Sequence, residues 1–270
     1  MLNSMITASN TMNQVQKQLD IIGHNIANVD TQGFKRTNTT FGELVRQQYD
    51  NQSDLNKEVG RSTDFGIRQG VGAQLMQNVV FSQGTIKKTE RNLDFAFTKP
   101  GQFLKVEADG QTRYTRSGAL YLSAEANGKL GLVNASGQRI LDENNQPILL
   151  NENASSITIS ANGTLTALDG NGQPAGTVNL GIVQSNKSQS LVQTNGNLYT
   201  LLNPNDQTAV TDLTGAARGQ ISVEQGALEM SNVDVSKEMT DMLVSQRAYQ
   251  FNAKSITIGD QMLGLINSVR

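Results

Sequence analysis

Residues 5–26 read MITASNTMNQVQKQLDIIGHNI, and their apolar side chains recur in unbroken steps of three and four. On an α-helix this spacing gathers the side chains into one narrow stripe, the a/d pattern of a helix that pairs with another helix. The stripe consists of Met5, Ala8, Met12, Val15, Leu19, Ile22 and Ile26. The pattern therefore predicts a long N-terminal helix that requires a partner.

A matching pattern lies at the other end of the chain, where apolar residues recur every seven positions. It is formed by Met242, Tyr249, Ile256 and Leu263 and is widened by Met239, Leu243, Ala253 and Ile266. We expect a C-terminal helix within 232–270 that starts near Val235. Asn232 or Asp234 would cap its first free amides, because their side-chain oxygens accept hydrogen bonds.

Polar residues interrupt the C-terminal stripe at Gln246, Asp260 and Asn267. They make the stripe too polar for a dry core, but they suit an interface shared between chains. The alternative is that each terminal helix covers its own domain. Because the two helices bracket the whole chain, we favour a coiled-coil-like pairing of the two.

The N-terminal helix runs into a turn that reads NIANVDTQGFKR over residues 25–36. Asn and Asp tolerate turn dihedrals, Gly33 permits a sharp reversal, and Phe34 anchors the outgoing strand. This stretch resembles the N-terminal signature of bacterial flagellar basal-body rod and hook proteins. The chain also resembles the family's C-terminal signature, at EMSNVDV (229–235), QRAYQ (246–250) and DQML (260–263), and its middle domain, at GQF (101–103) and YTRSG (114–118).

The resemblance implies a structural subunit of the flagellar rod, most similar to distal rod proteins. Such a subunit self-assembles with helical symmetry into a tube, transmits torque from motor to hook and encloses the export channel. A hook or proximal-rod subunit is the alternative within the family. The implied assembly interface consists of Met5, Met12, Val15, Leu19, Ile22, Ile26, Asn28, Thr31, Gly33, Phe34, Met239, Met242, Tyr249, Ile256 and Leu263.

The same resemblance implies where the protein lies and what it contacts. Its partners would be copies of itself, other rod and hook proteins and the flagellar type III export apparatus. We expect no nucleic acid, small-molecule substrate or membrane insertion. The protein would lie in the basal body outside the cytoplasm, in the periplasm or cell wall, exported without a cleaved signal peptide.

The composition is consistent with this expectation. Lysine and arginine total 22 against 24 acidic residues, with no long basic run, so the surface lacks the charge that nucleic-acid binding requires. Cysteine is absent, which excludes a disulfide framework and thiolate metal sites. The sequence has no 18-residue apolar span and no basic segment followed by an apolar run at its start.

The regions between the helices differ in pattern. After a helix and turn at 1–36, residues 37–90 are polar and without a steady period, and we expect an extended segment that is disordered in the monomer. Residues 91–215 alternate in polarity and predict a central antiparallel β-rich domain, followed by a return segment at 216–231. The strands of the β-rich domain are separated by Asp-Gly and Asn-Gly turns that begin at Asp109, Asn127, Asn162, Asp169 and Asn195.

Catalytic motifs are missing from the sequence. The single histidine, His24, stands on a helix flank without catalytic partners, and a calcium-like DGNG at 169–172 lacks the later Gly and Glu of such a loop. We find no nucleotide-binding glycine motif and no nucleophile elbow, and we predict no enzyme, metal or cofactor. The alternatives of another class are a secreted adhesin or an exported cell-wall enzyme. The enzyme would depend on Glu107, Asp109, Glu125, Asp142 and Glu143.

Overall fold

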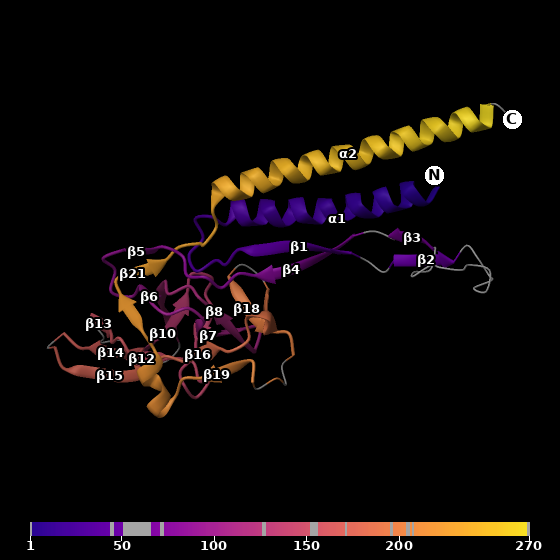
Figure 1. The fold of residues 1–270 in the computed structure, drawn as a ribbon. Helices are drawn as coiled ribbons and strands as arrows, with labels where there is room; N and C mark the ends of the chain where they lie inside the picture. The colour runs from indigo at the N-terminus through magenta and orange to yellow at the C-terminus, as the bar shows by residue number, and fades with distance from the viewer. Residues whose placement is uncertain are drawn as a thin grey trace. The chain divides into compact units, whose positions relative to one another are not determined.

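A computed structural model describes residues 2–43, 46–50, 66–70, 73–125, 128–151, 156–170, 172–194, 197–203, 206 and 208–268. An N-terminal helix, a central antiparallel β-rich region and a C-terminal helix follow one another (Figure 1). The chain divides into two compact units. The helical unit comprises Met1–His24, Asn38–Gln77 and Ser236–Arg270, and the knob comprises Asn25–Thr37 and Asn78–Val235.

Two long helices dominate the helical unit. Helix α1 spans Leu2–Ala27 and α2 spans Val235–Ser268, so the start expected for the C-terminal helix is correct. The helices run antiparallel (Figure 1), and a β-carbon added to Gly259 of α2 would stand 3.0 Å from Cγ of Met5 in α1. Neither helix, within the residues described, is long and apolar enough to cross a membrane.

Short strands accompany the helices. Strand β1 (Thr37–Glu43) pairs with β4 (Ala73–Val79), and β2 (Arg46–Asp50) pairs antiparallel with β3 (Gly66–Gly70). The Leu75 amide of β4 donates a hydrogen bond to the Gln14 side chain of α1. These strands lie in the polar segment 37–90, where the sequence shows no periodicity that would predict a strand. Each of these strands forms only by pairing with a strand distant in sequence. Disorder of that segment in the free monomer stays a prediction.

The stripe read from the N-terminal sequence is the covered face of α1. Ala8, Val15 and Ile22 are buried, and the other four stripe residues are half-buried. On α2 the buried residues are Glu238, Ser245 and Gly259, which are spaced by multiples of seven residues and so lie along one line of the helix. The predicted Met242, Tyr249, Ile256 and Leu263 flank this line and are half-buried.

The large residues that widen the predicted stripe of α2 are exposed in the single subunit, and their part in an assembly interface stays a prediction. Met239 is 53% exposed, Leu243 58% and Ile266 56%. The centre of the face that is covered within the subunit is held by the small residues Ser245 and Gly259. Small side chains allow a neighbouring helix to approach closely, and no hydrophobic scale reports this.

The knob is built from antiparallel β-structure. Its strands are β5 (Ile86–Lys88), β6 (Phe95–Phe97), β7 (Gln102–Ala108), β8 (Gln111–Thr115), β9 (Leu120–Glu125), β10 (Lys129–Asn134), β11 (Arg139–Ile140), β12 (Leu149–Asn151), β13 (Ser156–Ile159), β14 (Thr164–Leu168), β15 (Pro174–Asn179), β16 (Ile182–Ser185), β17 (Leu191–Gln193), β18 (Leu198–Leu201), β19 (Val210–Asp212), β20 (Val223–Gln225) and β21 (Ala227–Glu229). Two 3-10 helices lie at Ser188–Ser190 and Gly215–Gln220.

The largest sheet of the knob follows the order β12-β10-β11-β7-β8-β18-β17, with β9, β16 and β19 attached to it. A three-stranded sheet, β13-β14-β15, and the pairs β20-β6 and β21-β5 complete the unit. The return segment 216–231 therefore contains two strands that pair with strands near residues 86–97. As a result, both ends of the knob sequence meet at one place.

Tight turns and a continuous core explain why these strands pair. Asp109 (φ 54°) and Gly110 (φ 69°) join β7 to β8 at the predicted position, and Gly163 (φ 75°) joins β13 to β14. The predicted turns at 127–128 and 195–196 include Asn127, Asn195 and Gly196, which lie outside the described residues. Inward side chains such as Phe97, Leu104 and Leu132 are fully buried in one cluster. A separate cluster forms around Phe103 and Tyr199.

Candidate functional site

The knob contains a site where the chain segments that continue into the helical unit are held together. The first segment, Asn25–Thr37, runs from the last turn of α1 into β1. The second, residues 78–85, runs from the end of β4 towards β5, and the third, residues 229–235, runs from the end of β21 to the start of α2. We call these three segments, with Arg116, the junction. All of its residues belong to the knob.

The turn after α1 is closed by its own side chains. Asn28 and Thr31 are joined by two hydrogen bonds across the turn. The Thr31 hydroxyl donates to Oδ1 of Asn28 at 3.1 Å, and the Thr31 amide donates to the Asn28 carbonyl at 3.2 Å. The Asn25 amide group, which is buried, donates to the Thr37 carbonyl at 2.9 Å and accepts from the Thr37 amide at 3.1 Å. Asn25 thereby ties the end of α1 to the start of β1.

Gly33 and Phe34 seat this turn on the knob. Gly33 has a φ of +68°, and its amide donates to the Glu229 carbonyl at 2.8 Å. A β-carbon on Gly33 would stand 2.5 Å from the backbone nitrogen of Ser117. Phe34 is fully buried. The predicted Asn28, Thr31, Gly33 and Phe34 are thus brought together in one turn.

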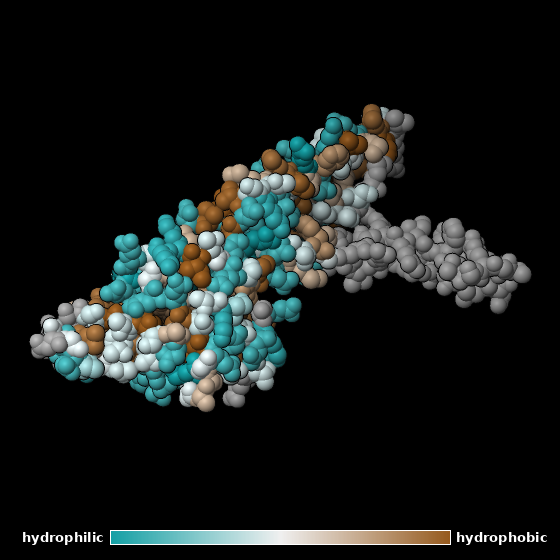
Figure 2. Space-filling view, turned by 60° about the vertical axis from the view of Figure 1, so that its left-hand side comes forward, coloured by the Kyte–Doolittle hydropathy of each residue, from teal (hydrophilic) through white to brown (hydrophobic). Residues whose placement is uncertain are grey.

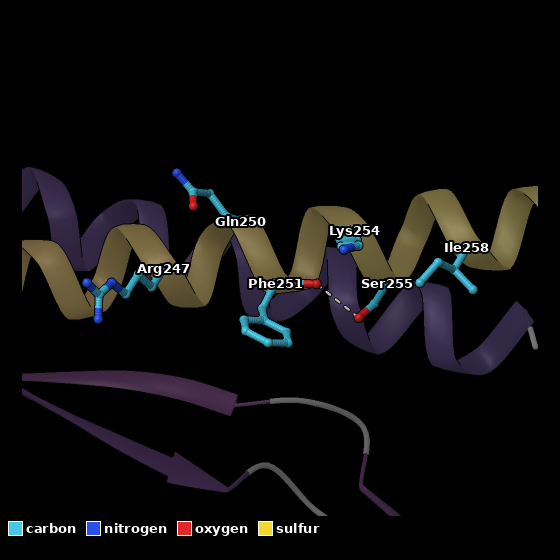
Figure 3. A pocket seen from close by; sticks show the side chains of 6 residues that line it. All are labelled: Arg247, Gln250, Phe251, Lys254, Ser255 and Ile258. Carbon is cyan, nitrogen blue, oxygen red and sulfur yellow. Dashed lines mark hydrogen bonds between the residues drawn. The ribbon is translucent and has the colours of Figure 1, made fainter.

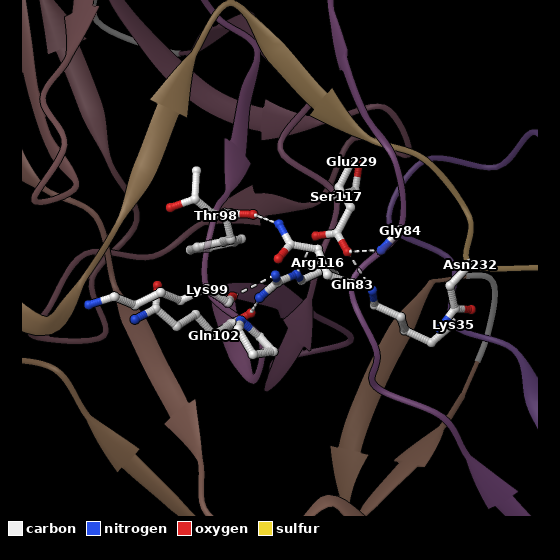
Figure 4. A network of polar contacts seen from close by, with 12 residues as sticks. Lys35, Gln83, Gly84, Thr98, Lys99, Gln102, Arg116, Ser117, Glu229 and Asn232 are labelled. Atoms are coloured by element: carbon white, nitrogen blue, oxygen red, sulfur yellow. Dashed lines mark hydrogen bonds and ion pairs between the residues drawn. The ribbon is translucent and has the colours of Figure 1, made fainter.

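A buried ion cluster holds the junction together (Figure 4). One oxygen of the Glu229 carboxylate accepts from Nζ of Lys35 at 2.5 Å and from the Gly84 amide at 2.9 Å. The other oxygen accepts from Nε of Arg116 at 2.6 Å. The side chains of Lys35, Arg116 and Glu229 are each 1% exposed. A charged group is retained at such depth only when it is paired and hydrogen-bonded.

The remaining donors of both cations reach backbone carbonyls. Lys35 also donates to the Ser82 carbonyl at 2.8 Å. Arg116 donates to the carbonyls of Lys99, at 2.7 Å, and Gln102. Burial lowers the pKa of the Lys35 ammonium and of the Arg116 guanidinium, while attraction to Glu229 favours their charged forms. The cluster is therefore a structural network in which every charged nitrogen of the two cations has a hydrogen-bond partner.

Asn232 fastens the segment that leads into α2. Its Oδ1 accepts from the Arg36 amide at 2.7 Å, and its Nδ2 donates to the Val80 carbonyl at 2.8 Å and to Ser82. The Val80 amide in turn donates to the Arg36 carbonyl at 2.8 Å. Of the two residues expected to cap α2, Asn232 is therefore not available, because its side chain is engaged by segments distant in sequence, and Asp234 directly precedes the helix.

Three of the residues considered for catalysis, Glu125, Asp142 and Glu143, make structural contacts. Asp142 Oδ1 accepts the amides of Asn144 and Gln146, each at 2.8 Å, which closes its own turn. Glu125 pairs with Arg139 at 2.8 Å, and His24 is exposed on α1. Within the described part of the chain, no group of three or more His, Asp or Glu side chains is arranged to hold a metal ion.

Sequence reasoning found the turn but missed the charged residues of the junction. Lys35, Glu229 and Asn232 lie in the quoted end signatures, and Arg116 lies in the YTRSG stretch. The available signal was a single charged or amide residue inside a short stretch that matches the family. What the sequence did not provide was their proximity, since Lys35 and Glu229 are 194 positions apart.

Comparison with known protein families matches this arrangement segment by segment. The model for flagella basal body rod protein matches residues 5–35, which include α1 and the turn. The flagellar hook protein FlgE/F/G D1 domain matches residues 99–167 of the knob. The flagellar basal body rod FlgEFG protein C-terminal model matches residues 224–269, which include Glu229, Asn232 and α2.

Full-length relatives show the same kinship. The flagellar hook-basal body complex protein FlhP of Bacillus subtilis is 49% identical over 275 residues, covering 100% of both chains. The flagellar basal-body rod protein FlgG of the same organism is 33% identical and covers 97% of both chains. FlgG of Buchnera aphidicola is 32% identical over 97% of this chain and 98% of its own length. This chain therefore belongs to the flagellar basal-body rod and hook protein family, and it is a structural subunit of the flagellar rod.

Proposed function

We propose that this subunit assembles with copies of itself, with helical symmetry, as part of the distal rod, where it encloses the export channel and transmits torque to the hook. The FlgG relatives are named basal-body rod proteins, and the FlhP relative is named a hook-basal body complex protein. These names support a position near the hook. Hook and proximal-rod subunits remain the alternatives within the family.

The observation that carries self-assembly is a second apolar stripe on α2. Val244, Phe251, Ile258 and Leu265 recur every seven residues and are 62%, 76%, 46% and 65% exposed. A seven-residue repeat keeps them on one side of the helix, apart from the covered line of Ser245 and Gly259. Burying side chains of this size stabilises a contact by about 1.5–3 kcal/mol each. The stripe is suited to packing against another subunit.

Exposed apolar residues concentrate in the helical unit. Of the fifteen large hydrophobic residues exposed in the described part of the chain, eleven belong to it and only Tyr121, Leu149, Val192 and Leu202 belong to the knob. Figure 2 shows such apolar side chains among polar ones along the helices. Large exposed apolar areas mark interaction surfaces. The helical unit is therefore the part that we assign to subunit contacts.

A hollow on α2 lies within this surface. It has a volume of about 420 Å³ and is lined by Arg247, Gln250, Phe251, Lys254, Ser255 and Ile258 (Figure 3). Phe251 and Ile258 are the apolar residues of its lining, and Arg247 and Lys254 are the cations. An apolar side chain of a neighbouring subunit with an acidic residue next to it would fit this hollow best.

The half-buried seam residues would complete the contact. We propose a coiled-coil-like pairing in which the α1 stripe faces Met242, Tyr249, Ile256 and Leu263, while the second stripe of α2 faces neighbouring subunits. Met5, Met12, Leu19 and Ile26, which are half-buried in one subunit, would then be shielded on assembly, beside Val15 and Ile22, which are already buried. The turn residues Asn28, Thr31, Gly33 and Phe34 would set the direction in which the knob leaves the tube wall.

The remaining features of the function follow from this assignment. We propose export through the flagellar type III apparatus without a cleaved signal peptide and a final position outside the cytoplasm. The protein would bind other rod and hook proteins and would act without catalysis, metal or cofactor. Of the carboxylates that an exported cell-wall enzyme would need, Glu125 is paired with Arg139 and Asp142 accepts the amides of its own turn.

Phe251→Glu tests the assembly proposal. We expect cells with intact export of the protein but no hooks, because a charge replaces the most exposed apolar residue of the stripe. Leu202→Glu is the matched control, since Leu202 is a 71% exposed knob residue. That variant should swim normally. Normal hooks in the Phe251→Glu cells would overturn the assignment of this stripe to assembly.

The position along the rod requires a separate experiment. An epitope inserted between Asp109 and Gly110 should be tolerated, because both residues are exposed in a tight turn and Gly110 faces open space. Electron microscopy of labelled hook–basal bodies should show the label on the distal part of the rod. Label along the hook or at the proximal end would displace the distal assignment.

A further inference from the structure

Glu229 contacts every segment of the junction. Its carbonyl accepts the Gly33 amide, its carboxylate accepts Lys35 on the same segment, and the same carboxylate accepts the Gly84 amide. Arg116 belongs to the link between β8 and β9 and connects the cluster to the body of the knob. Glu229 itself ends β21 and is followed by the segment that leads into α2.

The charges of the cluster do not balance. Two buried cations share one buried carboxylate, which gives the cluster a net charge of +1. Removing the carboxylate would leave two unpaired cations, which is strongly destabilising. Removing either cation would leave one cation paired with Glu229. This asymmetry makes Glu229 indispensable and lets each cation be replaced alone without stranding a charge.

We propose that Glu229 couples the segment leaving α1 and the segment entering α2 to the folded knob, so that the two segments are fixed or released together. Lys35 and Gly33 belong to the segment that leaves α1, and Met230 and Asn232 belong to the segment that enters α2. Arg116 connects Glu229 to the body of the knob. The two ends of the chain then lose their fixed paths whenever Glu229 loses its hold on Arg116. The segments next to α1 and α2 are therefore held in place only when the knob is folded.

The coupling would act as a checkpoint for polymerisation, a consequence that rests on the proposed function. A subunit whose knob is unfolded would not hold α1 and α2 in the arrangement that neighbours recognise. Only a subunit with a folded knob would then present its apolar helix stripes correctly to the end of the growing rod. The coupling itself is a property of the isolated chain and can be measured without any flagellum.

Native-state hydrogen exchange on the purified full chain tests the coupling, with Lys35→Met and Arg116→Met as the two variants. Two amides serve as reporters: Val80, bonded to the Arg36 carbonyl, and Met230, bonded to the Thr85 carbonyl. Neither amide is bonded to Arg116. We expect Arg116→Met to lower protection at both reporters, and Lys35→Met to lower it at Met230, by about tenfold or more.

Lys105→Met is the matched control, because Lys105 is a buried lysine of the knob paired at 2.7 Å with Asp212, away from the junction. It should leave both reporters protected. If Arg116→Met also leaves both protected, or Lys35→Met leaves Met230 protected, the segments are held independently and the proposal is overturned. If the exchange result holds and Lys35→Met cells still build hooks, the coupling stands and its use as an assembly checkpoint is refuted.

Discussion

Gly33 lies directly against the backbone of Ser117, where an added β-carbon would stand 2.5 Å from the Ser117 nitrogen. Gly33 also has a φ of +68°, a conformation that other residues adopt at a cost of about 1–2 kcal/mol. The contact joins the turn after α1 to the link between β8 and β9. A side chain at this position therefore disturbs both backbone conformation and packing.

We expect Gly33→Ala to lower the free energy of unfolding of the knob by about 3 kcal/mol, the sum of backbone strain and overpacking. Gly110→Ala is a close control, because Gly110 has a φ of +69° and nothing within 4 Å of an added β-carbon. It should cost only the backbone term. Urea unfolding of both variants measures the difference, and equal losses would show that the contact with Ser117 contributes nothing.

Gly259 and Gly264 of α2 should respond oppositely to the same substitution. Gly264→Leu should stabilise α2 by up to about 1 kcal/mol, since glycine is a poor helix former and open space surrounds it. Gly259→Leu should instead destabilise the helical unit by about 1–3 kcal/mol, because its β-carbon would press on Met5.

Thermal melts followed by far-ultraviolet circular dichroism would compare the two variants. Met5→Ala combined with Gly259→Leu should recover part of the loss, because it removes the obstructing side chain. Equal stabilisation by Gly259→Leu and Gly264→Leu would show that α1 and α2 are apart in the free subunit.

Limited proteolysis of the dilute monomer should leave a resistant knob. Strands β5 and β6 pair with β21 and β20, and residues 25–37 also belong to the knob, so we expect a main fragment of about residues 78–235 that keeps the peptide 25–37 bound. Mass spectrometry of the fragment gives its ends. Protection of the whole chain would instead mean that the helical unit is already stable in one molecule, and a fragment confined to 91–215 would contradict the pairing of these strands.

The alkaline stability of the knob should depend on Tyr199. Burial raises the pKa of its hydroxyl, so above about pH 10 the unfolded chain releases a proton that the folded knob retains. The free energy of unfolding then falls with pH by up to about 1.4 kcal/mol per pH unit from this group. Below that pH the group contributes no slope.

Tyr199→Phe should therefore flatten the alkaline decline between about pH 10 and pH 11, measured by urea unfolding at several pH values. The variant Tyr121→Phe, at a tyrosine that is 42% exposed, should follow the wild type. The same slope in Tyr199→Phe and wild type would mean that the Tyr199 hydroxyl ionises as readily in the folded knob as in the unfolded chain.

The sequence by itself determined the local elements of this protein. Steps of three and four over residues 5–26 place α1, a seven-residue repeat places α2, and the candidate caps Asn232 and Asp234 place its start near Val235. Asp109-Gly110 fixes the turn between β7 and β8. The end signatures identify the family. All of these are properties of contiguous residues, because helix period, turn conformation and motif matching are local.

Only the tertiary structure decided which side chains hold the ends of the chain. Lys35 and Glu229 are 194 positions apart, and Asn232 meets Arg36 across 196 positions. The covered face of α2 is likewise centred on Ser245 and Gly259, which no hydrophobic pattern marks. A buried charge is stable only beside its partners, and a small residue matters only when another element lies against it. Such facts depend on which distant segments meet, and that is settled by folding of the whole chain.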